Sequence, residues 1–172
     1  MRKFSLTLFM TLFALLASAS EIEVTQGKAT YLKKEGKVAV VFNWENAKWD
    51  RGKLVQDEWA EQFGAYKEEG EQHFINGFNE DSKMMKMVTE DSAADYIMNV
   101  EFTNFDKFYS VMSFVPGHKH KVWATITVTD NKTGETVCTY KVKEFEGGRD
   151  FAVFDSYTEA LRDLGSKLAK KK

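Results

Sequence analysis

Two histidines separated by one residue, His118 and His120, are the side chains best suited to chemistry. On an extended chain such residues project to the same side, and imidazole nitrogens are common ligands of zinc. A third ligand would have to come from elsewhere, for example His73, Glu101 or Asp106. The alternative, which we favour, is a polar entry to a strand with both imidazoles in solvent. We therefore expect no cofactor.

Aromatic residues are the second candidate group, at 14% of the chain. Exposed aromatic rings stack on sugars or anchor protein partners. Trp49 lies in a polar stretch, residues 46–52, and we expect it to be accessible. Four more aromatics lie in the irregular segment 105–121, where they either cover the core or form an exposed patch. The candidate ligand-binding residues are therefore Trp49, Phe105, Phe108, Tyr109 and Phe114.

Support for catalysis is lacking in the sequence. Cys138 is the only cysteine, so no internal disulfide can form, and its alternating surroundings (residues 135–140) predict a small buried apolar residue in a strand. Acidic residues are abundant, but a single sequence does not show two carboxyl groups held across a cleft. No motif for a serine hydrolase, a zinc peptidase, a phosphate-binding loop or a dinucleotide site is present. We predict that the protein is not an enzyme.

The first 19 residues have the order of a secretory signal peptide. Arg2 and Lys3 are followed by an apolar run, residues 6–16, and by Ala17-Ser18-Ala19. That run is shorter than the roughly 20 residues needed to span a bilayer. We therefore predict cleavage near Ala19, a periplasmic or secreted location without a stable membrane anchor, and one domain over residues 20–172. The mature chain is acidic, because the net charge of −2 becomes −4 when two positive residues leave, and nucleic acid is not an expected partner.

The elements that would position these residues follow from the spacing of apolar side chains. Two β-rich runs, 29–34 and 37–44, flank Glu35-Gly36 and predict a hairpin after a hydrophilic lead. Consecutive apolar residues at 38–42 predict a central strand buried on both faces. An aromatic stripe at helical spacing predicts a helix over 54–78, although Gly64 and Gly70 weaken its continuity.

The second half alternates in the manner of strands. Residues 84–89, 96–105, 121–130 and 135–143 each predict a strand, and the turn at 130–134 joins the last two as a hairpin. Ser156 and Glu159 match a capping box, which predicts that the final helix begins there and ends near Ala169. The fold class is therefore α+β: a mixed, mostly antiparallel sheet of five to six strands with two helices packed on it, and no third layer.

The order of these elements resembles small exported α/β envelope proteins of Bacteroides type, and loosely the periplasmic domain of the curli secretion channel. The resemblance rests on the strand at 38–42, the long helix, the Ala94-Asp95-Tyr96-Ile97 strand entry, the D-x-x-T-G-E turn at 130–135 and the closing helix. It implies helices on one face of a mixed sheet and a non-catalytic role in envelope assembly or binding. The chain lacks the lipid-bearing cysteine found in many such proteins.

The leading functional prediction is an exported, non-enzymatic protein that binds another component of the cell envelope, with self-association as a homo-oligomer left open. The alternative is a binder of a small ligand or a carbohydrate through the exposed aromatics. A metal-dependent hydrolase at His118 and His120 is the third hypothesis.

Overall fold

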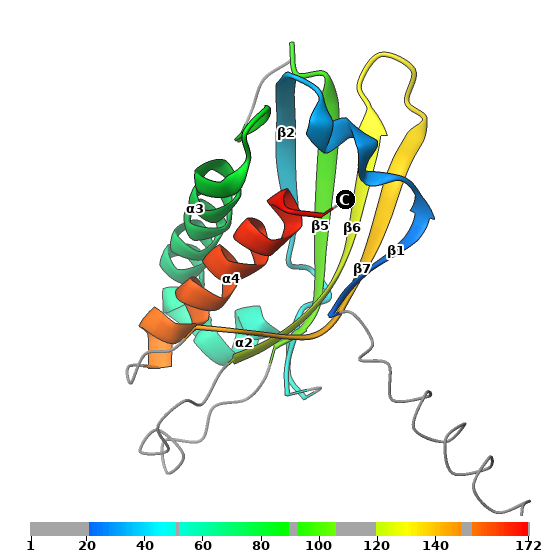
Figure 1. Ribbon diagram of the computed structural model, residues 1–172. Coiled ribbons are helices and arrows are strands. Elements are labelled where there is room, and N and C mark those ends of the chain that lie inside the picture. The colour runs from blue at the N-terminus through cyan, green and yellow to red at the C-terminus, as the bar shows by residue number, and fades with distance from the viewer. Residues whose placement is uncertain (1–20, 51, 90–92, 106–119, 149–152, 172) are drawn as a thin grey trace, which may run out of the picture.

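The protein forms a mixed β-sheet with two long helices on one of its faces (Figure 1). The computed structural model describes residues 21–50, 52–89, 93–105, 120–148 and 153–171, with the side chains of 153–156 left aside. Residues 1–20, which include the predicted signal peptide, lie outside this range.

Within the described chain, seven strands make up the sheet in the order β1-β7-β6-β5-β2-β4, and β3 adds to β5. The pairs β1–β7, β7–β6 and β6–β5 are antiparallel, whereas β5–β2, β2–β4 and β5–β3 are parallel. The predicted mixed sheet is thus confirmed. The strands are β1 (Ile22–Gly27), β2 (Gly36–Asn43), β3 (Lys48–Trp49), β4 (Met85–Val88), β5 (Tyr96–Phe105), β6 (His120–Asp130) and β7 (Thr136–Gly147).

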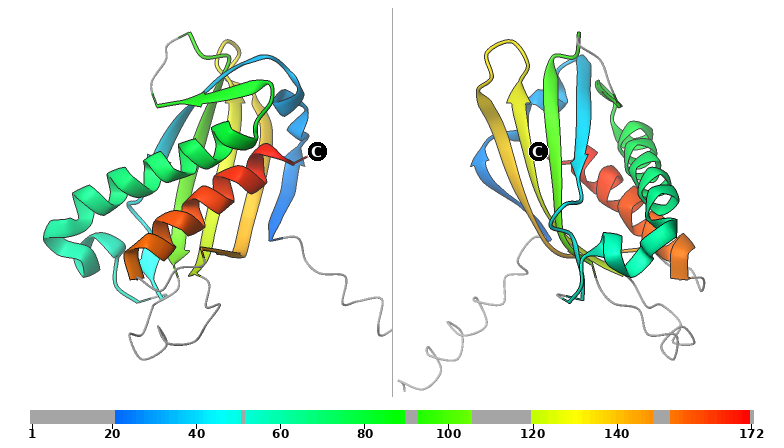
Figure 2. Two further views of the ribbon diagram at one scale, coloured as in Figure 1. Left: turned by 60° about the vertical axis from the view of Figure 1, so that its left-hand side comes forward. Right: turned by 180° about the vertical axis from the view of Figure 1, so that it is seen from behind.

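The helices α3 (Phe63–Asp81) and α4 (Val153–Ala169) cover the same face of the sheet (Figure 2). Helix α3 lies on the crossover that connects the parallel strands β2 and β4. Shorter helices complete the described elements: η2 (Ala29–Lys33), α2 (Val55–Trp59) and η3 (Ala60–Gln62).

Alternation along the strands decides which side chains face the helices. On β5 and β6 every second residue is buried, which places an apolar surface against α3 and α4. The predicted strands at 96–105 and 121–130, and the hairpin that follows them, are confirmed. The residues of these two strands that face the helices include Tyr96, Met98, Val100, Phe102, Val122, Ala124, Ile126 and Val128.

Helices α3 and α4 approach each other so closely that glycine is required at the crossing. A Cβ atom at Gly77 would overlap the backbone carbonyl of Arg162, and one at Gly165 would overlap the backbone carbonyl of Phe74. Gly70 lies one heptad before Gly77 and leaves room for the Tyr157 hydroxyl and Leu161. Absence of a side chain at these positions lets the two backbones pack almost directly on each other.

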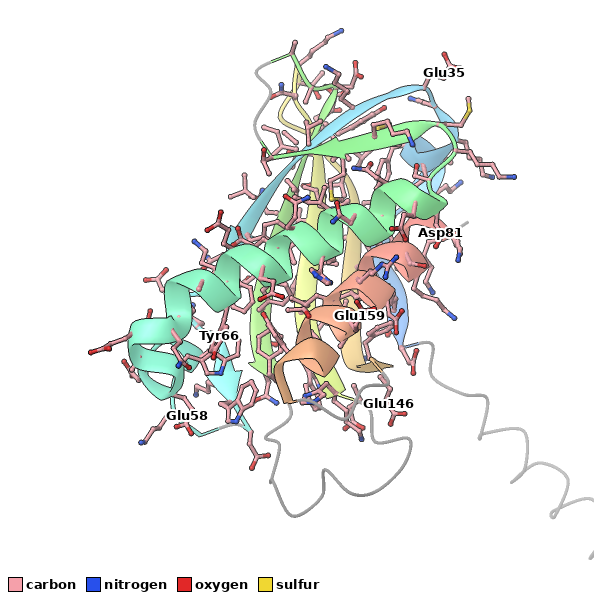
Figure 3. The ribbon with its side chains drawn as sticks, turned by 90° about the vertical axis from the view of Figure 1, so that its left-hand side faces the viewer. Glu35, Glu58, Tyr66, Asp81, Glu146 and Glu159 are labelled. Carbon is pink, nitrogen blue, oxygen red and sulfur yellow. The ribbon has the colours of Figure 1, made fainter. Side chains whose placement is uncertain are left out.

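Polar contacts join α3 to α4, and the residue numbers of the paired side chains increase together along both helices. The two helices are therefore parallel (Figure 3). His73 Nδ1 lies 3.5 Å from Glu159 Oε1. Further along, Arg162 contacts Glu80 at 2.9 Å, and Lys170 contacts Asp81 at 2.9 Å. Because these pairs are largely exposed, each contributes little to stability, and the buried glycine contacts dominate.

The predicted hairpin at 29–44 is wrong in its first half. Residues 29–33 form the 3-10 helix η2, which buries Tyr31 and Leu32 against the core. The stretch expected to be a lead instead forms β1, which pairs with β7 at the edge of the sheet. The chain turns between β1 and η2 at Gly27, whose φ of +70° suits glycine. Strand β2 instead pairs with β5 and β4, which are distant in sequence.

Two further expectations are corrected. Val41 of β2 is 52% exposed, so residues 38–42 are not buried on both faces, because the helices cover only one. The helix expected over 54–78 is divided at Ala60, where φ is +47°. This break reorients α2 and lets Val55 and Trp59 pack into the core. Gly64 and Gly70 lie within the continuous helix α3.

The final helix was expected to begin at a capping box formed by Ser156 and Glu159. Helix α4 begins at Val153, so Ser156 is already helical, and the Glu159 side chain contacts His73 and Arg162 instead. The predicted apolar stripe is confirmed, since Tyr157, Leu161, Leu164 and Leu168 are all buried.

Replacing Gly77 with alanine should lower the free energy of unfolding by about 2 kcal/mol, because the added methyl group forces the two helix backbones apart. Urea denaturation measures this change. The matched control is Gly64→Ala in the same helix, where a Cβ meets nothing within 4 Å. That variant should gain up to about 1 kcal/mol from helix propensity. Equal effects at the two positions would contradict the assigned close packing.

Candidate functional site

Trp49 does not form an accessible platform, contrary to expectation. It is 9% exposed, because residues 48–49 form the short strand β3 against the end of β5, and the indole turns inward. Its ring lies 5.4 Å from that of Trp59. The aromatic residue that looked solvent-exposed in a polar stretch is therefore part of the core.

Phe105 is brought close to Trp49, but also inside the molecule. It is 2% exposed, and its ring stacks on Trp44 at 5.5 Å and lies 5.3 Å from Tyr157. The remaining predicted aromatics, Phe108, Tyr109 and Phe114, lie outside the described residues. The structure thus unites two of the five candidates in a buried cluster rather than on a surface.

Of the two histidines, the structure describes only His120. His118 lies outside the described residues, whereas His120 begins β6 and is 2% exposed. The solvated imidazole expected at His120 is therefore wrong, because this position faces the core side of its strand. Among the described residues, no group of three or more histidine, cysteine, aspartate or glutamate side chains is placed to hold a metal ion.

Two polar groups, the Glu71 carboxyl and the Tyr157 hydroxyl, lie against the buried aromatic cluster. Trp44 donates its indole N–H to Glu71 Oε1 at 2.8 Å. Burial raises the pKa of Glu71, and the neighbouring Glu68 acts in the same direction, against the hydrogen bond from Trp44. The Tyr157 hydroxyl is buried without a hydrogen-bond partner among the described residues. Its burial, and the charges of Glu71 and Glu69, raise the pKa of Tyr157.

Hollows on the described surface are open and lined largely by polar and charged side chains. One of about 290 Å³ borders Trp49 and is otherwise lined by Asp50, Gly52, Lys53 and Glu58. Another, of about 440 Å³, lies along the outer side of α3 beside Glu68 and His73. A binding pocket for a small organic ligand is usually enclosed and mostly apolar. These hollows do not have that character.

The broadest candidate surface is the face of the sheet that α3 and α4 leave uncovered (Figure 2). We call it the open face and define it by the outward residues of β1, β2, β5, β6 and β7. Val41, Ile97, Trp123 and Val137 supply apolar groups beside the threonines of β6 and β7. Its central members are Ala39, Val41, Ile97, Asn99, Glu101, Thr125, Thr127, Thr129, Val137, Thr139 and Lys141.

Sequence reasoning identified these strands but not their open face as a site. The signal was available in the alternation of Thr125, Thr127 and Thr129, which predicts one face of a strand facing away from the core. The alternation does not show where the helices lie. It therefore does not show whether a second layer covers that face.

Comparisons with known proteins establish no family for this chain. No protein-family model matches the sequence, and no curated protein is significantly similar to it. Among solved structures, the PelC dodecamer from Paraburkholderia phytofirmans is 14% identical with a TM-score of 0.49, over 84% of this chain and 96% of that chain. A PelC dodecamer with one substitution, from the same organism, is 16% identical with a TM-score of 0.46, over 86% and 97%.

Both scores lie below 0.5, and neither likeness assigns a function. The resemblance to exported envelope proteins of Bacteroides type, and to the curli secretion channel, stays a prediction. In the described part of the chain, no helix is both long and apolar enough to span a bilayer.

Tyr157→Phe should raise the free energy of unfolding by about 1 kcal/mol, because it removes a buried hydroxyl that has no partner. The matched control is Tyr140→Phe, which removes a buried hydroxyl that donates to the Tyr31 hydroxyl at 3.3 Å. That control should lower stability by a similar amount. Urea denaturation of both variants tests the assignment, which fails if Tyr157→Phe is the more damaging.

Glu71→Gln should change how stability depends on pH. A carboxyl with a raised pKa binds protons more tightly in the folded state, so its contribution is full below the ordinary value of 4.5 and is lost as pH rises through the folded pKa. Glutamine keeps an acceptor for Trp44 without this loss. The variant should therefore gain stability relative to the native chain as pH rises across that window. Urea denaturation at a series of pH values, with Glu61→Gln on the exposed turn η3 as control, measures the difference.

Proposed function

We propose that the protein is exported and acts without catalysis as a binding or assembly component of the cell envelope, through the open face of its sheet. Export is supported by the order of charged, apolar and small residues over positions 1–19. The observation that carries the binding role is a broad sheet face covered by no described element. An uncovered surface of this extent suits a macromolecular partner better than a small ligand.

The charges around the open face favour a protein as that partner. Lys143 pairs with Glu23 at 3.1 Å, and Lys121 pairs with Glu144 at 3.2 Å. Positive and negative side chains therefore compensate each other at the periphery of the face. Nucleic acid or an anionic membrane would require a surplus of positive charge.

The edges of the sheet are less suited to binding than its face. Strand β1 at one edge carries an irregularity between Val24 and Gln26, and β4 at the other edge has four residues. Bulges and short strands at edges oppose the addition of a further strand. This protection directs a partner toward the open face.

Burial of Trp49 and Phe105 weakens the alternative of a carbohydrate or small-ligand binder. Stacking on a sugar needs an exposed ring face, and these two residues are 9% and 2% exposed. The other three predicted residues, Phe108, Tyr109 and Phe114, lie outside the described residues.

A cysteine placed on the open face should crosslink to a protein in the envelope of the producing cell. Thr127→Cys lies at the centre of the face, and the native Cys138 is fully buried, so a bis-maleimide reagent acts at the new thiol. Gel shifts and mass spectrometry identify the product. Mass spectrometry of the same material should find residues 1–19 removed.

The matched control is Gln72→Cys on the exposed side of α3. The proposal predicts crosslinks from position 127 and none from position 72. It is contradicted if position 127 yields no protein crosslink, if both positions behave alike, or if the leader remains attached in a cytosolic pool.

A further inference from the structure

The three central strands of the open face carry a pattern that is complementary to itself about β6. In one row across the sheet, Thr125 of β6 lies between Glu101 of β5 and Lys141 of β7. Because neighbouring strands are about 4.8 Å apart, the acidic and basic residues lie at equal distances on either side of Thr125. The Lys141 ammonium leans toward the centre and donates to Thr125 Oγ1 at 3.3 Å.

The next rows continue the same arrangement. Thr127 lies between Asn99 of β5 and Thr139 of β7, so polar residues flank the centre on both sides. In the following row, Thr129 is flanked by Ile97 on one side and by the Thr136–Val137 corner on the other. The rows of Thr125 and Thr127 thus have complementary or similar residues at matching positions about β6.

A two-fold axis along β6 would turn this pattern into a set of contacts. Such an axis keeps each row at its height and exchanges β5 with β7. Glu101 of one copy then faces the partner's Lys141, and the reverse pair forms at the symmetric position. Asn99 meets the partner's Thr139, and the threonines of β6 meet their own copies at the axis. Self-complementarity of one patch is the condition for an isologous dimer.

We propose that a second copy of this chain packs on the open face, with the two-fold axis along β6 and with Glu101 of each copy paired to the partner's Lys141. This inference rests on the proposed function, which makes the open face a binding surface, and it names the partner.

The size of the face is sufficient for this association. Five strands at about 4.8 Å, with lengths up to about 33 Å for ten residues, give an area on the order of 700 Å² per copy. Stable interfaces bury about 800 Å² per partner. Two sheets that pack face to face also keep their strands within about 30° of each other, which an axis along β6 allows.

Charge balance favours a second copy over a strongly charged partner. The open face carries lysines and glutamates in equal number, so it offers no net attraction to a highly acidic or basic surface. In the proposed register, an identical copy meets Glu101 and Lys141 with the opposite charge. The charged residues are Lys37, Lys121, Lys141, Lys143, Glu23, Glu101, Glu144 and Glu146.

Charge reversal tests the proposed register in the purified mature protein by sedimentation between about 1 and 100 µM. The native chain should dimerise in this range. Glu101→Lys and Lys141→Glu should each weaken the dimer about tenfold or more, because each puts like charges face to face. The double variant should regain the native affinity, and an equimolar mixture of the single variants should form heterodimers.

The matched control is Lys167→Glu, an exposed lysine on α4, which should leave dimerisation unchanged. Thermal unfolding of every variant confirms that the fold is retained. The proposal is overturned if the native protein is a monomer at the highest concentration. It is also overturned if neither charge reversal changes the dimer affinity. If the native protein is a monomer and Thr127→Cys still crosslinks to a different envelope protein, the proposed function stands and this inference fails. If the native protein is a monomer and Thr127→Cys forms no protein crosslink, both the proposed function and this inference fail.

Discussion

The close contact between the backbones of α3 and α4 is the constraint on which the rest of the structure depends. Gly77 and Gly165 bring each helix against a carbonyl of the other, at a separation that any side chain would prevent. Two parallel helices can then share a single face of the sheet. Their apolar stripes close over β2, β5, β6 and β7, and the core is complete on that side alone.

Because the helices cover only one side of the sheet, the large aromatic residues are buried on that side. Trp44, Trp49, Trp59 and Phe105 gather at the end of the sheet near the start of α3, where helices and strands converge. Burial of these rings removes water from large apolar surfaces and outweighs any tendency to leave a tryptophan in a polar loop. The same convergence buries Tyr157 and half-buries Glu71, which places polar groups in an apolar environment and raises their pKa values.

The uncovered side has the opposite character and is the surface on which the proposed binding role depends. Its threonines and valines shield one another on neighbouring strands, so most are half-buried without a second layer. Ion pairs at its periphery balance charge, while the sheet edges are irregular or short. Recognition on such a face relies on register and shape, since neither net charge nor a deep pocket is available.

The sequence by itself determined the local elements whose periodicity is strong. The strands at 96–105 and 121–130, the hairpin after Asp130 and the apolar stripe of the last helix follow from alternation and spacing, because burial of one face repeats along each element. The order of residues 1–19 likewise comes from the sequence alone. These features depend on neighbours along the chain.

Only the tertiary structure decided which side chains meet across elements. Pairing of β2 with β5 and β4, burial of Trp49 and His120, and the division of the helix at Ala60 all depend on contacts between distant segments. For the same reason, the sequence alone did not predict the open face. Alternation shows which face of each strand is apolar, but only the tertiary structure shows that both long helices cover that face and leave the other one open.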